Sequence, residues 1–292
     1  MSLRPDDPVR RSESRFEGAG STLLFRRAWL AADPRRLLIL VHGFGEHSGR
    51  YDELGAWFAR RGHAVHAYDQ RGHGRSAGPR AYVERFDVFL DDLEAFIQRT
   101  SEEHPGLDRT VIGHSMGGLV LLALACERDP ALGRVVTSGA ALCPSSQLSA
   151  WTLTLARILM RVLPRLRLDS GIDPEGLSRD PGVVTRYVED PLVDTHITLS
   201  LAVGMMETAQ RILHAGGELT LPLLMLHGEA DALCLPQGSR SFFSDLPPGA
   251  ARDASELHIY PELRHEIFNE PEREKVFSDI LGWIDAGDQG GA

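Results

Sequence analysis

The chain has 292 residues, of which 42% are hydrophobic and 25% are charged, as in ordinary globular proteins. Its formal net charge of −10 disfavours nonspecific binding to nucleic acid, which attracts basic surfaces. No apolar run is long enough to span a bilayer, and residues 1–20 lack the apolar centre of a signal peptide or membrane anchor.

Three cysteines, Cys126, Cys143 and Cys234, lie far apart in the sequence and have no spacing typical of a metal site. An odd number of cysteines without a secretory signal predicts free thiols in a reducing compartment. We therefore expect a cytoplasmic protein without a metal site.

The first half of the chain alternates predicted strands and helices. Residues 1–12, rich in Pro, Asp and Arg, are expected to be flexible, and two weak strands at about 13–17 and 22–30 predict a hairpin at a sheet edge. Further strands are expected at 37–41, 63–68, 109–112 and 134–142, with helices at about 50–60, 87–103 and 118–126. This alternation predicts a parallel sheet with helices on both faces, whose functional sites lie beyond the C-terminal ends of the strands.

The alternation stops between residues 144 and 216, where the sequence is helix-rich and irregular. It resumes with predicted strands at 221–226 and 256–260 and with helices at about 236–245 and 271–286. We interpret 144–216 as a cap inserted into a core of residues 13–143 and 217–292. The insertion falls between strands whose ends face the expected site, which is the position of a lid.

The motif Gly113-His114-Ser115-Met116-Gly117 joins a predicted strand to a predicted helix. Such a turn needs glycine at 113 and 117, because larger side chains would collide with the neighbouring strand and helix. G-x-S-x-G in this context is typical of a nucleophile elbow, which lifts the serine Oγ above the sheet. The alternative is a serine in a tight turn without a catalytic role. We predict that Ser115 is a nucleophile.

A serine nucleophile needs a base, and the base needs an orienting partner. Histidines in the predicted site-facing turns are His42, His47, His73 and His114. We expect the side chain of His114 to point away from that of Ser115, because the two residues are adjacent. His265 is the predicted base, since it follows the last strand and completes the chain order Ser, Asp, His. A surface histidine is the alternative.

The predicted acid is Asp231, at the end of the restored strand, with Glu229 as the alternative. The strand after the elbow helix ends without a carboxylate. Asp69 also ends a strand, but on the side of the sheet away from His265. We therefore predict that Asp69 is structural and holds the 69–76 loop through backbone hydrogen bonds.

Acyl transfer also needs two donors for the oxyanion. The elbow supplies the N–H of Met116 at the helix N-terminus, and the loop after the 37–41 strand supplies the N–H of Phe44. The alternative is that the glycines of that loop only allow a tight turn and that the loop has no role in binding the oxyanion. The expected mechanism is attack of Ser115 on an ester carbonyl with His265 as base, followed by hydrolysis of the acyl-enzyme.

The predicted cap carries an apolar stripe at helical spacing: Leu155, Ile158, Leu159, Val162, Leu163 and Leu166. Beside it, Arg157, Arg161 and Arg165 repeat every four residues. One interpretation is a lid helix whose apolar face packs on the core while the arginines lie in water. The other is a basic amphipathic helix in peripheral contact with an anionic lipid surface.

A second cap helix is expected at about 195–213. Leu159 in the first cap helix and Met205 and Met206 in the second are candidates to line an adaptable acyl pocket, although such stripes are usually plain core. An apolar pocket would favour long acyl chains, since each buried methylene contributes roughly 0.8 kcal/mol.

Together these motifs resemble the monoacylglycerol lipases and related lysophospholipases of the α/β-hydrolase fold. The resemblance covers about residues 13–286. Its motifs stand at 42–51, 69–76, 113–118, 227–231 and 260–270, with further cap motifs at 177–181 and 190–192. It implies a mostly parallel central sheet with helices on both faces and a helical cap inserted before the strand that carries Asp231.

The resemblance further implies hydrolysis of monoacylglycerols to glycerol and fatty acid without a cofactor. The implied triad is Ser115, Asp231 and His265, and the implied oxyanion donors are Phe44 and Met116. Cys234 matches a site-lining cysteine of some members, although a buried small residue is an equal alternative.

Other functions remain as alternatives. A lysophospholipase or general carboxylesterase would keep the same triad, and a non-catalytic receptor would keep only the fold. Dehalogenases and epoxide hydrolases are disfavoured because they need Asp at position 115, and a peptidase would need an acidic pocket for an amino terminus. The expected partner is a small-molecule ester, and the oligomeric state is left open.

Overall fold

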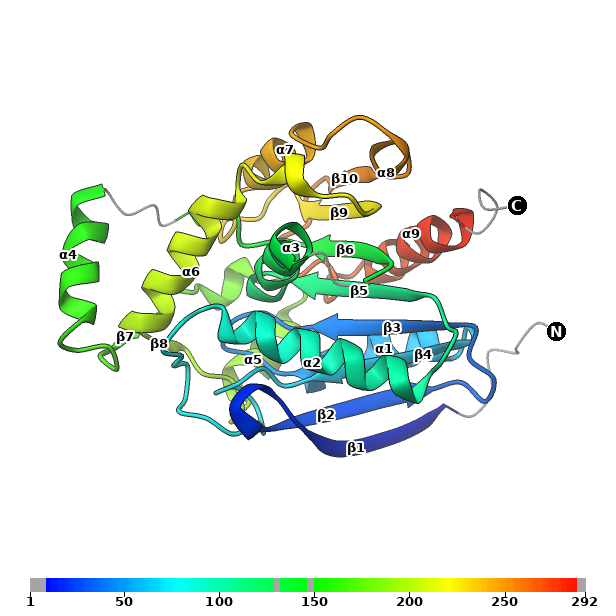
Figure 1. Cartoon of the computed structure of the whole chain (residues 1–292), viewed down its shortest axis with the longest axis horizontal. Coiled ribbons are helices and arrows are strands. Elements are labelled where there is room, and N and C mark those ends of the chain that lie inside the picture. Colours follow the sequence, from blue (N-terminus) through cyan, green and yellow to red (C-terminus); the bar gives the residue numbers. More distant parts are fainter. Residues whose placement is uncertain (1–8, 129–131, 146–149, 288–292) are drawn as a thin grey trace.

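The computed structural model describes residues 9–128, 132–145 and 150–287, and an eight-stranded sheet forms its centre (Figure 1). The strands are β1 (Arg10–Glu17), β2 (Leu23–Leu30), β3 (Arg36–Val41), β4 (His63–Tyr68), β5 (Arg109–His114), β6 (Arg134–Ser138), β9 (Leu223–Gly228) and β10 (Glu256–Tyr260). Their order across the sheet is β1-β2-β4-β3-β5-β6-β9-β10. The pairs β1–β2 and β2–β4 are antiparallel, and the other neighbours are parallel.

Helices cover both faces of the sheet because its central strands are apolar on both sides. Along β3, Leu37, Ile39 and Val41 belong to one hydrophobic core, and Leu38 and Leu40 belong to the other. The first core includes α2 (Val88–Glu103) and α3 (Met116–Arg128), and the second includes α1 (Asp52–Ala59) and α9 (Arg273–Ala286). The predicted α/β-hydrolase fold, a mostly parallel sheet with helices on both faces, is confirmed.

Two sequence-based boundaries need correction. β1 begins at Arg10, which pairs with Leu30, so residues 10–12 belong to the edge hairpin and not to a flexible segment; residues 1–8 lie outside the described residues. β6 ends at Ser138, four residues before the predicted end, because Gly139 adopts a left-handed φ of 54° that no strand continues.

The cap elements follow β6. They are α4 (Ala150–Met160), β7 (Arg167–Asp169), η3 (Pro174–Gly176), α5 (Pro181–Glu189), β8 (His196–Thr198), α6 (Leu199–Ile212) and η4 (Gly216–Glu218). Figure 1 shows α4 at one end of the molecule, on the outer side of α6. A small core that includes Leu153 of α4 with Leu199 and Val203 of α6 joins the two helices. The strands β7 and β8 form a separate antiparallel pair.

The expectation that the apolar stripe of the first cap helix packs on the core is wrong. The face of α4 that packs on α6 carries Leu153, Ala156 and Met160, so the residues between them point outward. Leu155, Ile158 and Leu159 are 54%, 56% and 38% exposed. The helix also ends at Met160, before the end of the predicted stripe. Among the described helices, none combines the length and apolarity that crossing a membrane requires.

The core resumes after the cap with β9 and β10. Two further helices, α7 (Pro236–Ser244) and α8 (Ala250–Asp253), connect these strands, and short turns η1 (Ala19–Ser21) and η2 (Ser48–Tyr51) lie near the N-terminal half of the sheet. The parallel strands β3, β5, β9 and β10 therefore bring four loops to one edge of the sheet. These loops carry the residues predicted for the site.

Candidate active site

Ser115 occupies the turn between β5 and α3 in a strained backbone conformation. Its φ is 51°, in the left-handed region that non-glycine residues rarely adopt. A side chain at Gly117 would overlap the carbonyl oxygens of Val41 and His42, which explains the glycine at that position. Strain of this kind costs on the order of 1–3 kcal/mol and persists where the surrounding structure enforces it.

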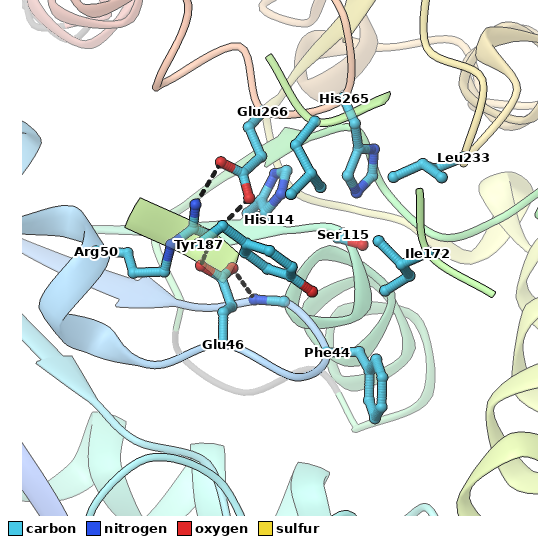
Figure 2. A pocket seen from close by; sticks show the side chains of 12 residues that line it. Phe44, Glu46, Arg50, His114, Ser115, Ile172, Tyr187, Leu233, His265 and Glu266 are labelled. Carbon is cyan, nitrogen blue, oxygen red and sulfur yellow. Dashed lines mark hydrogen bonds and ion pairs between the residues drawn. The ribbon is translucent and has the colours of Figure 1, made fainter. Parts of the chain in front are cut away.

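His265 and Asp231 form a hydrogen-bonded pair beside this turn. Nδ1 of His265 lies 2.7 Å from Oδ2 of Asp231. The other oxygen of Asp231 accepts hydrogen bonds of 2.9 Å from the backbone N–H groups of Leu233 and Cys234. Because Nδ1 of His265 forms the hydrogen bond to Asp231, only Nε2 of the ring is available to accept a proton from Ser115. Figure 2 shows the ring of His265 above Ser115, and both residues line the pocket.

The ionisation of this pair suits a general base. Burial lowers the pKa of His265, but Asp231 outweighs burial, and the net pKa lies above the ordinary value. Burial raises the pKa of Asp231, but His265 and His227 outweigh that effect and hold it well below its usual range. Asp231 is therefore ionised at neutral pH and favours a hydrogen on Nδ1 of His265.

The two backbone N–H groups predicted as oxyanion donors, those of Phe44 and Met116, have no hydrogen-bond partner among the described residues. The peptide before Phe44 is held on both sides, because Gly43 N donates to Glu46 Oε1 at 2.6 Å and the Gly43 carbonyl lies 2.7 Å from Nδ1 of His42. This loop is thus fixed with the Phe44 N–H unpaired.

A pocket surrounds these groups (Figure 2). It is lined by Gly43, Phe44, Glu46, Arg50, His114, Ser115, Ile172, Leu177, Tyr187, Leu233, His265 and Glu266. Ile172, Leu177 and Tyr187 come from the cap, so the cap forms part of its wall. Within the described residues, no cluster of three or more His, Cys, Asp or Glu side chains has the arrangement of a metal site.

One wall of the pocket is a buried ion cluster. Arg50 donates to both oxygens of Glu266 at 2.5 and 2.8 Å and to Glu46 at 3.0 Å. Tyr51 donates to the other oxygen of Glu46 at 2.7 Å. Burial raises the pKa of Glu266, but Arg50 overcomes it and lowers the pKa to about 2. Both carboxylates are therefore paired with one guanidinium.

Comparisons with known proteins agree with this geometry. A family model described as serine aminopeptidase, S33, matches residues 32–272. A monoacylglycerol lipase of Mycolicibacterium smegmatis is 34% identical over 276 residues, which cover 94% of this chain and 97% of the relative. The human monoglyceride lipase is also 34% identical, over 91% of this chain and 88% of its own. The chain belongs to the α/β-hydrolase family that this model describes and that includes these monoacylglycerol lipases.

Solved structures support the same assignment. The crystal structure of a Paleococcus ferrophilus monoacylglycerol lipase matches with a TM-score of 0.77 and 31% identity, covering 94% of this chain and 98% of that chain. A soluble variant of the Saccharomyces cerevisiae monoglyceride lipase, in complex with a substrate analog, shares the fold with a TM-score of 0.84 at 24% identity and 97% coverage of both chains. The predicted resemblance to monoacylglycerol lipases is confirmed.

Several residues of this hydrolase lie where the sequence did not predict them. The side chain of His114 lines the pocket and does not point away, and its ring lies 4.8 Å from that of His265. The carbonyl and hydroxyl of Ser138, 3.1 and 3.2 Å from Nδ1 of His114, hold it there. Burial, followed by the influence of His265, lowers the pKa of His114 to about 4, so it is neutral at pH 7.

The cap candidates for substrate contact do not meet in this pocket. Leu159 is on the exposed face of α4, Met205 packs against the main core, and Met206 packs between α4 and α6. Periodicity indicates which residues share a helix face but not which neighbour that face meets. Cys234 is buried outside the pocket lining.

Other predicted residues have structural partners. Asp69 accepts from the backbone N–H groups of Ser48 at 2.8 Å and Arg75 at 2.7 Å, and so holds its loop as predicted. Glu229, the alternative acid, is exposed. His47 pairs with Asp190 of the cap at 2.9 Å.

Sequence reasoning missed Arg50, Glu266 and Tyr187. Arg50 and Glu266 lie in segments that follow predicted strands, and this position could have indicated that they line the pocket. The position of Tyr187, which lies on α5, depends on how the cap folds over the core and has no sequence signal.

Proposed function

We propose that the protein is a serine esterase that hydrolyses monoacylglycerols to glycerol and free fatty acid through an acyl-enzyme on Ser115. The observation that carries this proposal is the His265–Asp231 hydrogen bond beside a serine in an elbow of positive φ. The monoacylglycerol lipases among its relatives, at 34% identity over nearly the whole chain, support the ester class.

Each group has a defined role in the proposed reaction. Nε2 of His265 takes the proton of Ser115 as Oγ attacks the ester carbonyl, and Asp231 stabilises the imidazolium. The N–H groups of Phe44 and Met116 bind the oxyanion of the tetrahedral intermediate. His265 then gives its proton to the departing alcohol, and a water that it activates hydrolyses the acyl-enzyme.

The polar wall of the pocket supports a small polyol as the leaving group. The hydroxyl of Tyr187 is buried and has no hydrogen-bond partner among the described residues. Its ring lies 4.9 Å from the guanidinium of Arg50, and Tyr187, Arg50 and Glu46 all line the pocket. A glycerol hydroxyl would satisfy the Tyr187 hydroxyl, which otherwise carries the desolvation cost of an unmade hydrogen bond.

The same wall argues against an aminopeptidase, the activity in the description of the matching family model. A substrate ammonium needs a carboxylate that is free to pair with it. Glu46 and Glu266 line the pocket, but both are paired with Arg50. A lysophospholipase or general carboxylesterase would have the same catalytic groups. Only the preferred substrate distinguishes these activities from that of a monoacylglycerol lipase.

Turnover of a substrate panel tests the proposal. We expect kcat/KM to be highest for long-chain monoacylglycerols, compared with diacylglycerols, triacylglycerols, lysophospholipids, acetyl esters and aminoacyl arylamides. Ser115→Ala should lower kcat by roughly 10⁶ and abolish the burst with an activated ester. Ser278→Ala, on the exposed side of α9, is the control and should be unchanged. Faster cleavage of an arylamide, or activity in Ser115→Ala, would refute the proposal.

We also propose that the outer face of α4 and the turn after it contact a lipid surface, which gives the protein a peripheral membrane location. Trp151 and Val162 are 72% and 75% exposed, and neighbouring apolar side chains extend the patch; these are Leu155, Ile158, Leu159, Leu163 and Leu166. Arg161 stands beside Val162 with its side chain exposed. Apolar side chains flanked by arginine are typical of helices that lie in a bilayer interface.

Sedimentation with vesicles tests this contact. The protein should bind vesicles of phosphatidylcholine with phosphatidylglycerol. Trp151→Ser combined with Val162→Ser should weaken binding at least tenfold, since the variant lacks two large apolar groups whose transfer out of water favours binding. Leu23→Ser, at a 46% exposed position of β2 outside the cap, should bind as the wild type does. Equal binding by the double variant would contradict the assignment of this face.

A further inference from the structure

A second histidine, His227, lies against the same carboxylate oxygen as His265. His227 is the penultimate residue of β9, and its side chain is fully buried. Its Nε2 is 3.0 Å from Oδ2 of Asp231 and 2.8 Å from the carbonyl oxygen of Cys234. Nδ1 of His265 approaches the same Oδ2 at 2.7 Å. Two imidazoles therefore share one oxygen of the proposed catalytic acid.

The partners of His227 fix which of its nitrogens carries hydrogen. A carboxylate and a carbonyl oxygen only accept, so Nε2 must be the donor. Nδ1 lies 2.8 Å from the hydroxyl of Ser239, which donates to it. All contacts of His227 are thus satisfied by the neutral ring, and the charge at this end of the site remains on Asp231.

We propose that His227 is a positioning residue for Asp231, an inference that rests on the proposed roles of Ser115, Asp231 and His265. Its Nε2–H holds the Asp231 carboxylate so that Oδ2 faces His265. It also binds the Cys234 carbonyl and so closes the turn whose N–H groups hold Oδ1. Because two donors draw on one oxygen, His227 limits how strongly Asp231 stabilises protonated His265.

This sharing predicts a change in pH dependence when the donor is removed. In His227→Leu, the ionisable groups that face His265 are unchanged; they are Asp231, Glu266, Glu46 and His114. Oδ2 then binds only His265, so the imidazolium becomes more stable. The acidic limb of kcat/KM should move to higher pH by about 0.5–1 unit. kcat should also fall about tenfold, since the orientation of the carboxylate then depends only on His265 and the two N–H groups on Oδ1.

Two further variants separate positioning from packing. His227→Gln places an amide N–H where Nε2 was and should restore the acidic limb and bring kcat to within about threefold of wild type. Ser239→Ala is the matched control, because Ser239 is equally buried but contacts the opposite nitrogen of the ring. It should leave the acidic limb unmoved even if it lowers the melting temperature.

A measurement on the wild type covers the case in which His227→Leu does not fold. In protein with ¹⁵N-labelled histidine, the Nε2–H resonance of His227 should move as His265 titrates, because both donate to Oδ2. A resonance that stays fixed would overturn the proposal. An unchanged pH profile and kcat in His227→Leu would also overturn the proposal. In that case, loss of activity in Asp231→Asn would still support the proposed triad of Ser115, Asp231 and His265. Activity that survives in Ser115→Ala would instead overturn the proposed function.

Discussion

Ionisation of His265 sets the pH range in which Ser115 can be activated. The imidazole must be neutral to accept the serine proton, and Asp231 overcomes burial to raise its pKa above the ordinary value of about 6.5. Activity is therefore lost as pH falls through this raised pKa. We expect the acidic limb of kcat/KM to have a midpoint above about 6.5. A midpoint clearly below that value would contradict the dominance of Asp231.

Asp231→Asn tests the same pair by substitution. The amide removes the negative charge and favours the wrong tautomer of His265, so kcat should fall by about 10⁴. Glu229→Gln, at the exposed neighbouring carboxylate, should leave kcat unchanged. Stopped-flow turnover of an activated ester measures both. An Asp231→Asn enzyme that kept a tenth of the activity would point to another acid.

The single residues that sequence predicted best are those whose position follows from a strand end. Ser115, Asp231 and His265 stand one, three and five residues after the ends of parallel strands, so the topology brings them to one edge of the sheet. His114 was misjudged because its side-chain direction depends on the strained turn and on Ser138 across the sheet. Contacts of that kind do not follow from residue spacing.

At the scale of elements, the buried pair of Arg50 and Glu266 joins η2 to the loop that carries His265. Glu266 has a pKa of about 2 in the folded protein, against about 4.5 in an unfolded chain. Its ionised form therefore stabilises the fold by about 3 kcal/mol at neutral pH. This contribution is complete above about pH 4.5 and is lost as pH falls toward 2.

Glu266→Gln should accordingly lower the free energy of unfolding by about 3 kcal/mol at pH 7. The difference from the wild type should narrow by about 2 kcal/mol between pH 5 and pH 3, because the wild type loses the same ion pair there. Urea titrations at several pH values measure this. Glu262→Gln, a carboxylate with an 82% exposed side chain in the same loop, is the control and should change stability by less than about 0.5 kcal/mol. A pH-independent difference would contradict the role of ionisation.

The elements themselves were predictable where one pattern decided them. The continuous apolar run of β3 required cover on both faces, and the structure provides it through two cores. In the cap, α4 has apolar residues on more than one face, so its periodicity could not say which face meets α6. That choice is made by tertiary packing, since α4 ends before Arg161 and Arg157 pairs with Glu207 of α6.

Across the whole molecule, the cap rests on both loops that carry the proposed chemistry. The backbone N–H of Asp194 donates to Gly45 beside Phe44 at 2.8 Å, and that of Glu266 donates to Leu177 at 2.8 Å. The far end of the cap, α4, stands away from these contacts at one end of the molecule (Figure 1). A change on the outer face of α4 should therefore leave the catalytic groups in place.

This separation predicts that the double variant Trp151→Ser with Val162→Ser loses activity only on lipid-borne substrate. With a monoacylglycerol in vesicles, its kcat/KM should fall about tenfold, in proportion to the lost surface binding, because fewer enzyme molecules reach the substrate. With a water-soluble short-chain ester, kcat/KM should match the wild type, since the contacts at Gly45 and Glu266 are retained. Equal losses on both substrates would mean that α4 acts through the catalytic loops and not through the lipid surface, and Leu23→Ser should show neither loss.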